Sequence, residues 1–220
     1  MNVPADAWDE IVTSGQAAQY GMLSGLVGNR VHFIGAEKDM GFFRDFDADM
    51  PKTQIDLVPL DQAQGIICTG LVDDITQTPA DYRATLLMAK TLGLPMLCAN
   101  PDVTVHVGGQ LQYCAGALAA EYQAMGGKAL YFGKPHPPIY DLARQKLAAM
   151  GVDGAVLCIG DGINTDILGA SGEALDSLYI TSGIDHPRFG NDTATPDAIL
   201  LEAFLTEKQL SPTYSMGFLK

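Results

Sequence analysis

The chain has 220 residues, of which 47% are hydrophobic and 18% charged, a composition typical of a globular protein with one or two domains. Its 26 acidic and 13 basic side chains give a formal net charge of −13. This balance argues against the clustered Lys and Arg that bind nucleic acid or an anionic membrane surface without sequence preference. No apolar stretch approaches the roughly 18 residues of a membrane span.

The N-terminal segment and the cysteines indicate the cellular compartment. The opening MNVPADAWDE lacks the basic and apolar regions of a secretory signal peptide. The cysteines follow no CxxC spacing, so buried, reduced thiols are expected rather than disulfides or a zinc site; they are Cys68, Cys98, Cys114 and Cys158. We therefore expect a cytoplasmic protein.

Short apolar runs that end in Gly, Asp, Asn or Thr alternate with helix-like patterns along the chain. Strands are expected at 31–35, 65–70, 95–102, 129–135, 155–162 and 177–184, and helices at 14–26, 79–92, 115–125, 137–150, 164–173 and 196–208. This alternation predicts an α/β fold with a largely parallel sheet. Such sheets bind ligands at the carboxyl ends of their strands, which is where the polar residues of each run lie.

The run AVLCIGDGINTDILGA carries the first candidate site residues. Asp161 follows an apolar strand between two glycines, and Asp166 lies in the helix that comes next. Carboxylates at a strand tip are suited to Mg2+, with Asp166 able to orient the first carboxylate or a metal-bound water. A dinucleotide fingerprint would need Gly where Thr165 stands. The plainer alternative is a turn Asp followed by a helix-capping Asp.

The segment ALYFGKPHPPIYDLA carries the second candidate. Lys134 follows a strand and a Gly, and a Pro comes directly after it. An ammonium group held in this turn is suited to neutralise a phosphoryl oxygen or to keep a carboxylate ionised. His136 is interpreted as a loop residue or helix cap rather than as a catalyst.

Together these patterns resemble a known family. Gly-Lys-Pro, a helix, and a strand ending in Gly-Asp-x-x-x-Thr-Asp are similar to motifs three and four of the haloacid dehalogenase-like (HAD) phosphohydrolases. The flanking segments resemble the class IIA members with a large α/β cap, the NagD-like and 4-nitrophenylphosphatase-like enzymes. These segments are IVTSGQAAQY (11–20), CANPD (98–102), YCAGALAA (113–120) and GKPHPPIYDLA (133–143), and the resemblance covers nearly the whole chain.

The resemblance implies a role for each matching residue. Asp161 would be a Mg2+ ligand, and Asp166 would be its partner in the metal site. Lys134 would stabilise the nucleophile and the transferring phosphoryl group. Asn100 and Asp102 would lie on the cap side of the cleft and bind substrate.

The resemblance also implies a division into domains. Residues 17–126 would form the inserted α/β cap, while 1–16 and 127–220 would belong to a Rossmann-like core that is incomplete at its N-terminus. Gly126-Gly127 and the segment Lys134 to Pro138 are the candidate seams in the sequence.

The family's mechanism further needs an Asp-x-Asp at the tip of the first core strand and a Thr or Ser on the second strand, both ahead of the cap. No strand ending in Asp-x-Asp precedes Ile11. Asp45-Phe46-Asp47 with Thr69 is a forced substitute, because no buried strand leads into it. It is expected to be an acidic loop, as are Asp47-Ala48-Asp49 and Asp73-Asp74.

We therefore expect that the intact protein is a Mg2+-dependent phosphohydrolase that acts on small phosphorylated metabolites through an aspartyl phosphate. The chain as given lacks the nucleophile and is expected to be inactive, through truncation, a start codon assigned too late, or natural loss. A missing strand would leave sheet edges exposed, which favours association with further copies. The alternative functions are a catalysis-deficient module that binds a phosphorylated ligand or a partner, and an α/β domain of unrelated function.

Overall fold

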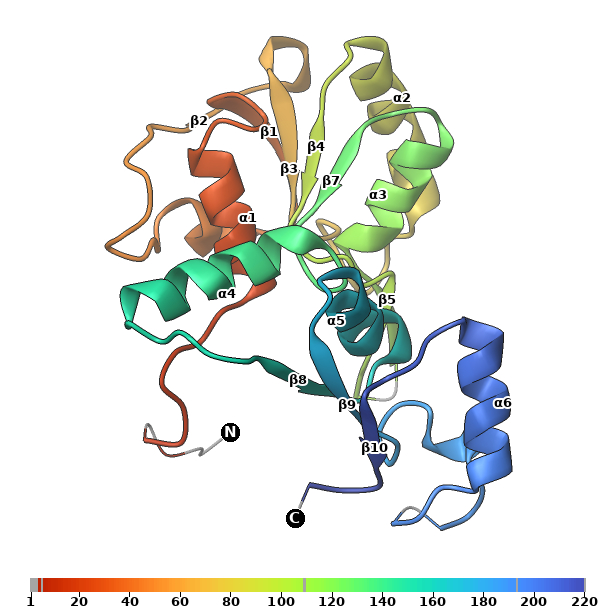
Figure 1. Ribbon diagram of the computed structural model, residues 1–220. Coiled ribbons are helices and arrows are strands. Elements are labelled where there is room, and N and C mark those ends of the chain that lie inside the picture. Colours follow the sequence, from red (N-terminus) through yellow and green to blue (C-terminus); the bar gives the residue numbers. More distant parts are fainter. Residues whose placement is uncertain (1–3, 5, 109, 193, 220) are drawn as a thin grey trace. The chain divides into compact units, whose positions relative to one another are not determined.

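A computed structural model describes residues 4, 6–108, 110–192 and 194–219. Contacts between residues divide the chain into two compact units, Met1–Gly133 and Lys134–Lys220. The predicted α/β class is confirmed, since parallel strands alternate with helices in both units (Figure 1). Over these described ranges, no helix combines the length and the apolar character needed to cross a lipid bilayer.

The first unit is built on a five-stranded, all-parallel sheet with the order β2-β1-β3-β4-β7. The register places Val31 opposite Gly65 and Cys68 opposite Cys98. The strands are β1 (Arg30–Ile34), β2 (Asp56–Leu57), β3 (Gly65–Cys68), β4 (Met96–Cys98) and β7 (Ala129–Tyr131).

Helices cover both faces of this sheet, with α1 on one side and α2 and α3 on the other (Figure 1). Every residue of β3 and β4 is consequently buried, which explains why these strands are continuous apolar runs rather than alternating ones. The helices are α1 (Ser14–Leu23), α2 (Arg83–Thr91) and α3 (Ala115–Ala124), with the short 3-10 turns η1 (Glu37–Phe43), η2 (Leu60–Gln62) and η3 (Pro79–Tyr82).

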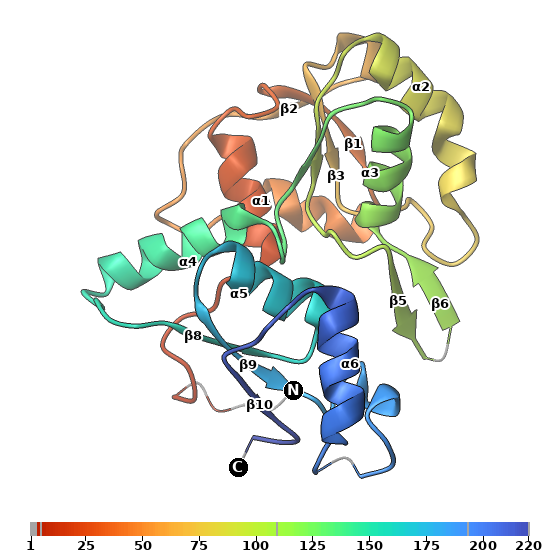
Figure 2. The same cartoon turned by 45° about the vertical axis from the view of Figure 1, so that its right-hand side comes forward.

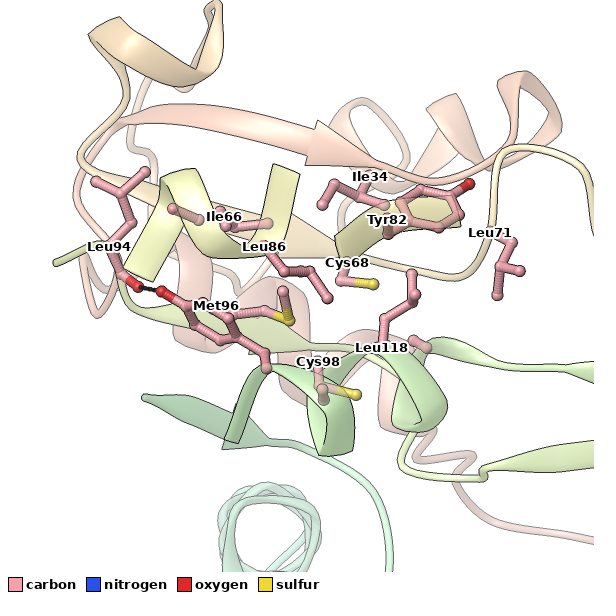
Figure 3. Packing of buried hydrophobic residues seen from close by; sticks show 14 residues of the cluster. Ile34, Ile66, Cys68, Leu71, Tyr82, Leu86, Leu94, Met96, Cys98 and Leu118 are labelled. Carbon is pink, nitrogen blue, oxygen red and sulfur yellow. Dashed lines mark hydrogen bonds between the residues drawn. The ribbon is translucent and has the colours of Figure 1, made fainter. Parts of the chain in front are cut away.

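The core between the sheet and helices α2 and α3 is formed by alternate strand residues and the apolar faces of the two helices (Figure 3). Ile66 and Met96 point into it from the sheet, and Leu86 and Leu118 close it from the helices. The buried Tyr122 hydroxyl donates a hydrogen bond of 2.6 Å to the Leu94 carbonyl. Its burial is therefore compensated.

The cysteines match the expectation of free thiols. Cys68, Cys98 and Cys114 are buried, and Cys158 is half-buried. Burial raises the pKa of Cys98 to about 12 and raises that of Cys68 as well. These thiols therefore stay protonated near neutral pH and pack as small apolar side chains.

A two-stranded antiparallel hairpin lies outside the five-stranded sheet (Figure 2). It consists of β5 (Thr104–Val107) and β6 (Gln110–Tyr113). It occupies the connection between β4 and α3 and was not predicted, because its strands are largely exposed and carry no continuous apolar run.

The second unit contains a three-stranded parallel sheet with the order β10-β9-β8. A small core forms where Tyr179, Phe189 and Phe204 pack against η4, with edge-to-face contacts between their rings. The elements are α4 (Pro137–Ala149), β8 (Leu157–Gly160), the π turn η4 (Ile163–Ile167), α5 (Leu168–Gly172), β9 (Asp176–Ile180), η5 (His186–Arg188), α6 (Ala198–Lys208) and β10 (Tyr214–Met216).

Each predicted strand and helix is present, with ends that differ by a few residues. The two compact units divide after Gly133, at the candidate seam Lys134 to Pro138 and not at Gly126-Gly127, because β7 pairs with β4 in the first sheet. The assignment of 17–126 to a cap and of the remainder to a core stays a prediction. The C-terminal tail contributes β10.

Candidate functional site

Lys134 and Asp166 are brought together in the second unit. The Lys134 ammonium group donates a hydrogen bond to Asp166 Oδ1 and forms an ion pair with it. The Lys134 side chain is 48% exposed, whereas that of Asp166 is 12% exposed. The carboxylate is thus fixed inside the protein, and the ammonium group keeps an open side for a ligand.

The backbone around Asp166 explains why it is held so firmly. Its other oxygen, Oδ2, accepts a hydrogen bond of 2.9 Å from the Gly162 N–H. A Cβ at Gly160 would lie 2.2 Å from Asp166 Cγ, so only glycine leaves room for the carboxylate at the end of β8. Both Asp166 oxygens are occupied by partners within the chain, which makes Asp166 a positioning group for Lys134.

Asp161 lies directly after β8 and is held from a different part of the chain. Its Oδ2 accepts a hydrogen bond of 3.1 Å from the Ile184 N–H, in the loop after β9. A Cβ at Gly183 would lie 2.0 Å from the same oxygen. The second carboxylate therefore depends on a close backbone approach at Gly183.

Gly183 and Ile184 were not identified as site residues from the sequence. They end the run SLYITSGI, which was interpreted only as a strand. The signal that could have found them is a glycine at the carboxyl end of a strand next to β8, since neighbouring parallel strands end at the same edge of a sheet.

The carboxylates of Asp161 and Asp166 do not form a complete protein cage for Mg2+. Among the described residues, no group of three or more His, Cys, Asp or Glu side chains is arranged to hold a metal ion. Mg2+ commonly binds through one or two carboxylates, with water and phosphate completing its shell. Asp161, with one oxygen not engaged by Ile184, fits this role better than Asp166.

Two further side chains belong to the same unit. His136 stands at the N-cap position of α4, in agreement with its interpretation as a loop residue or helix cap, and burial lowers its pKa. Burial raises the pKa of Tyr140 to about 12, with smaller contributions from Cys158 and Asp166. Both groups are therefore uncharged near neutral pH.

Asn100 and Asp102 lie in the first unit, in the loop between β4 and β5. The Asp102 N–H donates a hydrogen bond of 3.1 Å to Asn100 Oδ1. Both residues line a cleft of about 570 Å³ at the carboxyl end of the five-stranded sheet. Their predicted role in binding substrate stays a prediction.

The acidic loop interpretations are confirmed. The segment with Asp45, Asp47 and Asp49 follows η1 rather than a strand, and it is tied to α1 by a hydrogen bond of 2.9 Å from Gln16 Nε2 to Asp47 Oδ2. Asp73 accepts from the Ile75 N–H and the Thr76 N–H and hydroxyl within a turn, which lowers its pKa. None of these carboxylates stands at the end of a buried strand.

The comparison with known proteins agrees with this geometry. The HAD-hydrolase-like family model matches residues 131–204, the part that contains Lys134, Asp161 and Asp166. A solved hydrolase of the haloacid dehalogenase-like family from Brucella suis 1330 is 36% identical to this chain, with a TM-score of 0.77. The match covers all of this chain and 75% of the Brucella chain. The chain belongs to the HAD hydrolase superfamily, class IIA.

Other members show how far the likeness extends. Ribonucleotide monophosphatase NagD of Escherichia coli K12 is 30% identical over 103 residues, which are 47% of this chain and 39% of NagD. The chain thus aligns with well under half of that curated HAD relative. The glycerol phosphate phosphatase of Mycobacterium tuberculosis, solved with magnesium, shares the fold at 24% identity and a TM-score of 0.64, over 93% of this chain and 55% of its own.

Proposed function

We propose that the protein in its intact form hydrolyses small phosphomonoesters with Mg2+ through an aspartyl phosphate. The observation that carries this proposal is the fixed pair of Lys134 and Asp166, together with Asp161 directly after β8. In the proposed reaction a carboxylate oxygen attacks phosphorus and the alcohol leaves; water then releases inorganic phosphate from the enzyme. Membership of the superfamily and its phosphatase relatives support this reaction class.

Each residue of this chain has a role that follows from its contacts. Lys134, oriented by Asp166, balances the negative charge of the phosphoryl oxygens through its exposed side. Asp161, anchored by the Ile184 N–H, offers its remaining oxygen to Mg2+. When bound, the metal would add positive charge next to the phosphoryl group.

Neither carboxylate at this site is suited to be the nucleophile. Asp166 is neutralised by Lys134 and bonded to the Gly162 N–H, and Asp161 is assigned to the metal. We therefore propose that the 220-residue chain by itself does not turn over substrate. It would still bind Mg2+ and inorganic phosphate weakly, which is also what a catalysis-deficient binding module would do.

The first test measures phosphate release from 4-nitrophenyl phosphate, glycerol phosphate and nucleoside monophosphates. It uses the protein isolated at its natural length from its source, beside the 220-residue chain. We expect Mg2+-dependent release from the natural protein and none from the 220-residue chain. Turnover by the short chain that disappears in Asp161→Asn would contradict the proposal that this chain does not turn over substrate. A natural protein with no activity and no Mg2+ binding would overturn the phosphatase proposal.

The second test assigns the residues in the active protein. Lys134→Ala removes a preorganised charge that stabilises the transition state, so we expect kcat to fall about 10²- to 10³-fold. Asp161→Asn is expected to raise the Mg2+ concentration needed for half-maximal activity at least about tenfold. Lys128→Ala and Asp153→Asn, which change exposed side chains of the same types, are matched controls and should leave both quantities unchanged.

A further inference from the structure

The cleft in the first unit is lined by residues of that unit, and only Asn100 and Asp102 among them carry a predicted role. It lies at the carboxyl end of the parallel sheet, where α/β proteins bind ligands. A smaller hollow of about 240 Å³ shares Lys38, Asp39, Thr69 and Asn100 with it and extends toward the β5–β6 hairpin. The main cleft of about 570 Å³ falls within the range of small-molecule sites.

The charges in this cleft argue against a phosphate group as its occupant. Lys38 is the one cation among its described lining residues, and its ammonium group is paired with Asp74 at 2.5 Å. This pairing raises the pKa of Lys38 and leaves its charge balanced. The carboxylates of Asp39 and Asp102 remain in the lining and would repel an anion.

The polar groups instead match a ligand that both donates and accepts hydrogen bonds. The Thr69 hydroxyl donates to Asp39 Oδ2 at 2.8 Å, which orients the carboxylate and leaves oxygen lone pairs as acceptors. Asn100 adds an amide donor, because its oxygen already accepts from the Asp102 N–H. Phe42 and Ala99 supply apolar surface beside these groups.

A ligand with hydroxyl groups is best suited to hydrogen-bond with both the donors and the acceptors that line the cleft. A phosphate oxygen only accepts, and an ammonium group only donates, whereas each hydroxyl does both. The apolar part of the lining fits the C–H face of a polyol or sugar. The Thr69 hydroxyl can occupy its position only because residue 35 is glycine, since a Cβ at Gly35 would lie 2.1 Å from the hydroxyl oxygen.

We infer that the cleft of the first unit binds an uncharged, hydroxyl-rich group, a polyol or sugar, through Asp39, Thr69 and Asn100. This inference deepens the proposed function. If the bound group is the alcohol part of the phosphomonoester, the inference rests on that proposed function. The binding itself needs neither Mg2+ nor turnover. It can therefore be tested apart from the phosphatase reaction.

The experiment titrates the 15N-labelled 220-residue chain, free of Mg2+, with glycerol, ribose and glucose and follows the backbone amides by NMR. Inorganic phosphate and ethanolamine are the anionic and cationic comparison ligands. We expect at least one polyol or sugar to shift the Thr69 and Asn100 amides saturably. Asp39→Asn should weaken that binding about tenfold or more, since it removes a charged acceptor.

Three variants separate binding from folding. Thr69→Val removes the hydroxyl and should weaken binding, and Thr69→Ser retains it and should preserve binding. Asp61→Asn, an exposed carboxylate in η2 of the same unit, is the matched control. The amide spectrum of each variant reports directly whether it is folded.

Three results would overturn the inference. They are the absence of saturable shifts with every polyol and sugar, tighter binding of phosphate or ethanolamine at the same amides, and unchanged affinity in Asp39→Asn. None of them bears on phosphate release, so the phosphatase proposal fails or stands on its own test.

Discussion

The buried central strands of the first unit differ from β8, the half-exposed edge strand that precedes the candidate site in the second unit. In the first unit, β3 and β4 are buried at every position between two layers of helices. In the second, β8 pairs with β9 alone among the described strands, and Leu157 and Ile159 on it are 45% and 49% exposed. The candidate catalytic carboxylates follow this half-exposed strand, so the residues of the chemistry and the bulk of the buried core lie in different units.

The thiols give the largest expected difference between the units. Burial raises the pKa of Cys98 from 9.0 to about 12, which lowers its thiolate fraction at pH 8 about 10³-fold. Half-buried Cys158 on β8 has its pKa raised less, with the charge on Asp166 as a second cause. We expect a thiol reagent to modify Cys158 first in the native chain, as measured by mass spectrometry of peptides. If Cys98 reacted first, the result would contradict the burial of β4.

The same shift predicts a loss of stability in alkali. A thiol whose pKa is higher in the folded chain than in the unfolded chain stabilises the fold fully below pH 9. That contribution fades as the pH rises from about 9 toward 12. Cys98→Ala should flatten this part of the curve of unfolding free energy against pH, while Cys158→Ala should change it less.

Truncation of one leucine in each unit tests the packing difference directly. Leu118→Ala removes a fully buried side chain from the first core and should cost about 2–5 kcal/mol. Leu157→Ala removes a side chain that is 45% exposed and should cost less than about 1 kcal/mol. Native-state hydrogen exchange measures each unit separately, and equal costs would show that β8 is packed as tightly as the strands of the first sheet.

The close approach at Asp161 is the next test. Gly183→Ala would place a methyl carbon 2.0 Å from Asp161 Oδ2, so the carboxylate or the loop must move at a cost of about 1–3 kcal/mol. We expect weaker Mg2+ binding by calorimetry together with this destabilisation. Gly154→Ala, whose added carbon would meet nothing within 4 Å, is the matched control and should change neither quantity.

The smallest effect concerns the start of α1. The Thr13 hydroxyl accepts from the Gln16 N–H, and Gln16 Oε1 accepts from the Thr13 N–H, which completes a capping box. Thr13→Ala should destabilise the first unit by about 1 kcal/mol in thermal unfolding. Thr13→Ser keeps the hydroxyl and should restore the loss, and a failure to do so would mean that the methyl group rather than the cap matters.

Much of this site could be predicted because its residues are close in sequence. Asp161 and Asp166 are separated by one turn, and Lys134 stands in a Gly-Lys-Pro turn, so local patterns and family resemblance were enough to select them. The partners that hold them were not predicted. Gly183 and Ile184 approach Asp161 only because β9 lies beside β8.

By itself the sequence determined the α/β class, the order of the main strands and helices, and the family, because apolar periodicity, turn residues and short motifs are local properties. Only the tertiary structure decided the pairing of Lys134 with Asp166, the membership of β7 in the first sheet, and the polar cleft around Asp39 and Thr69. Each of these depends on contacts between residues about 30 positions apart in the chain, and such contacts form only when the sheet and its loops are assembled.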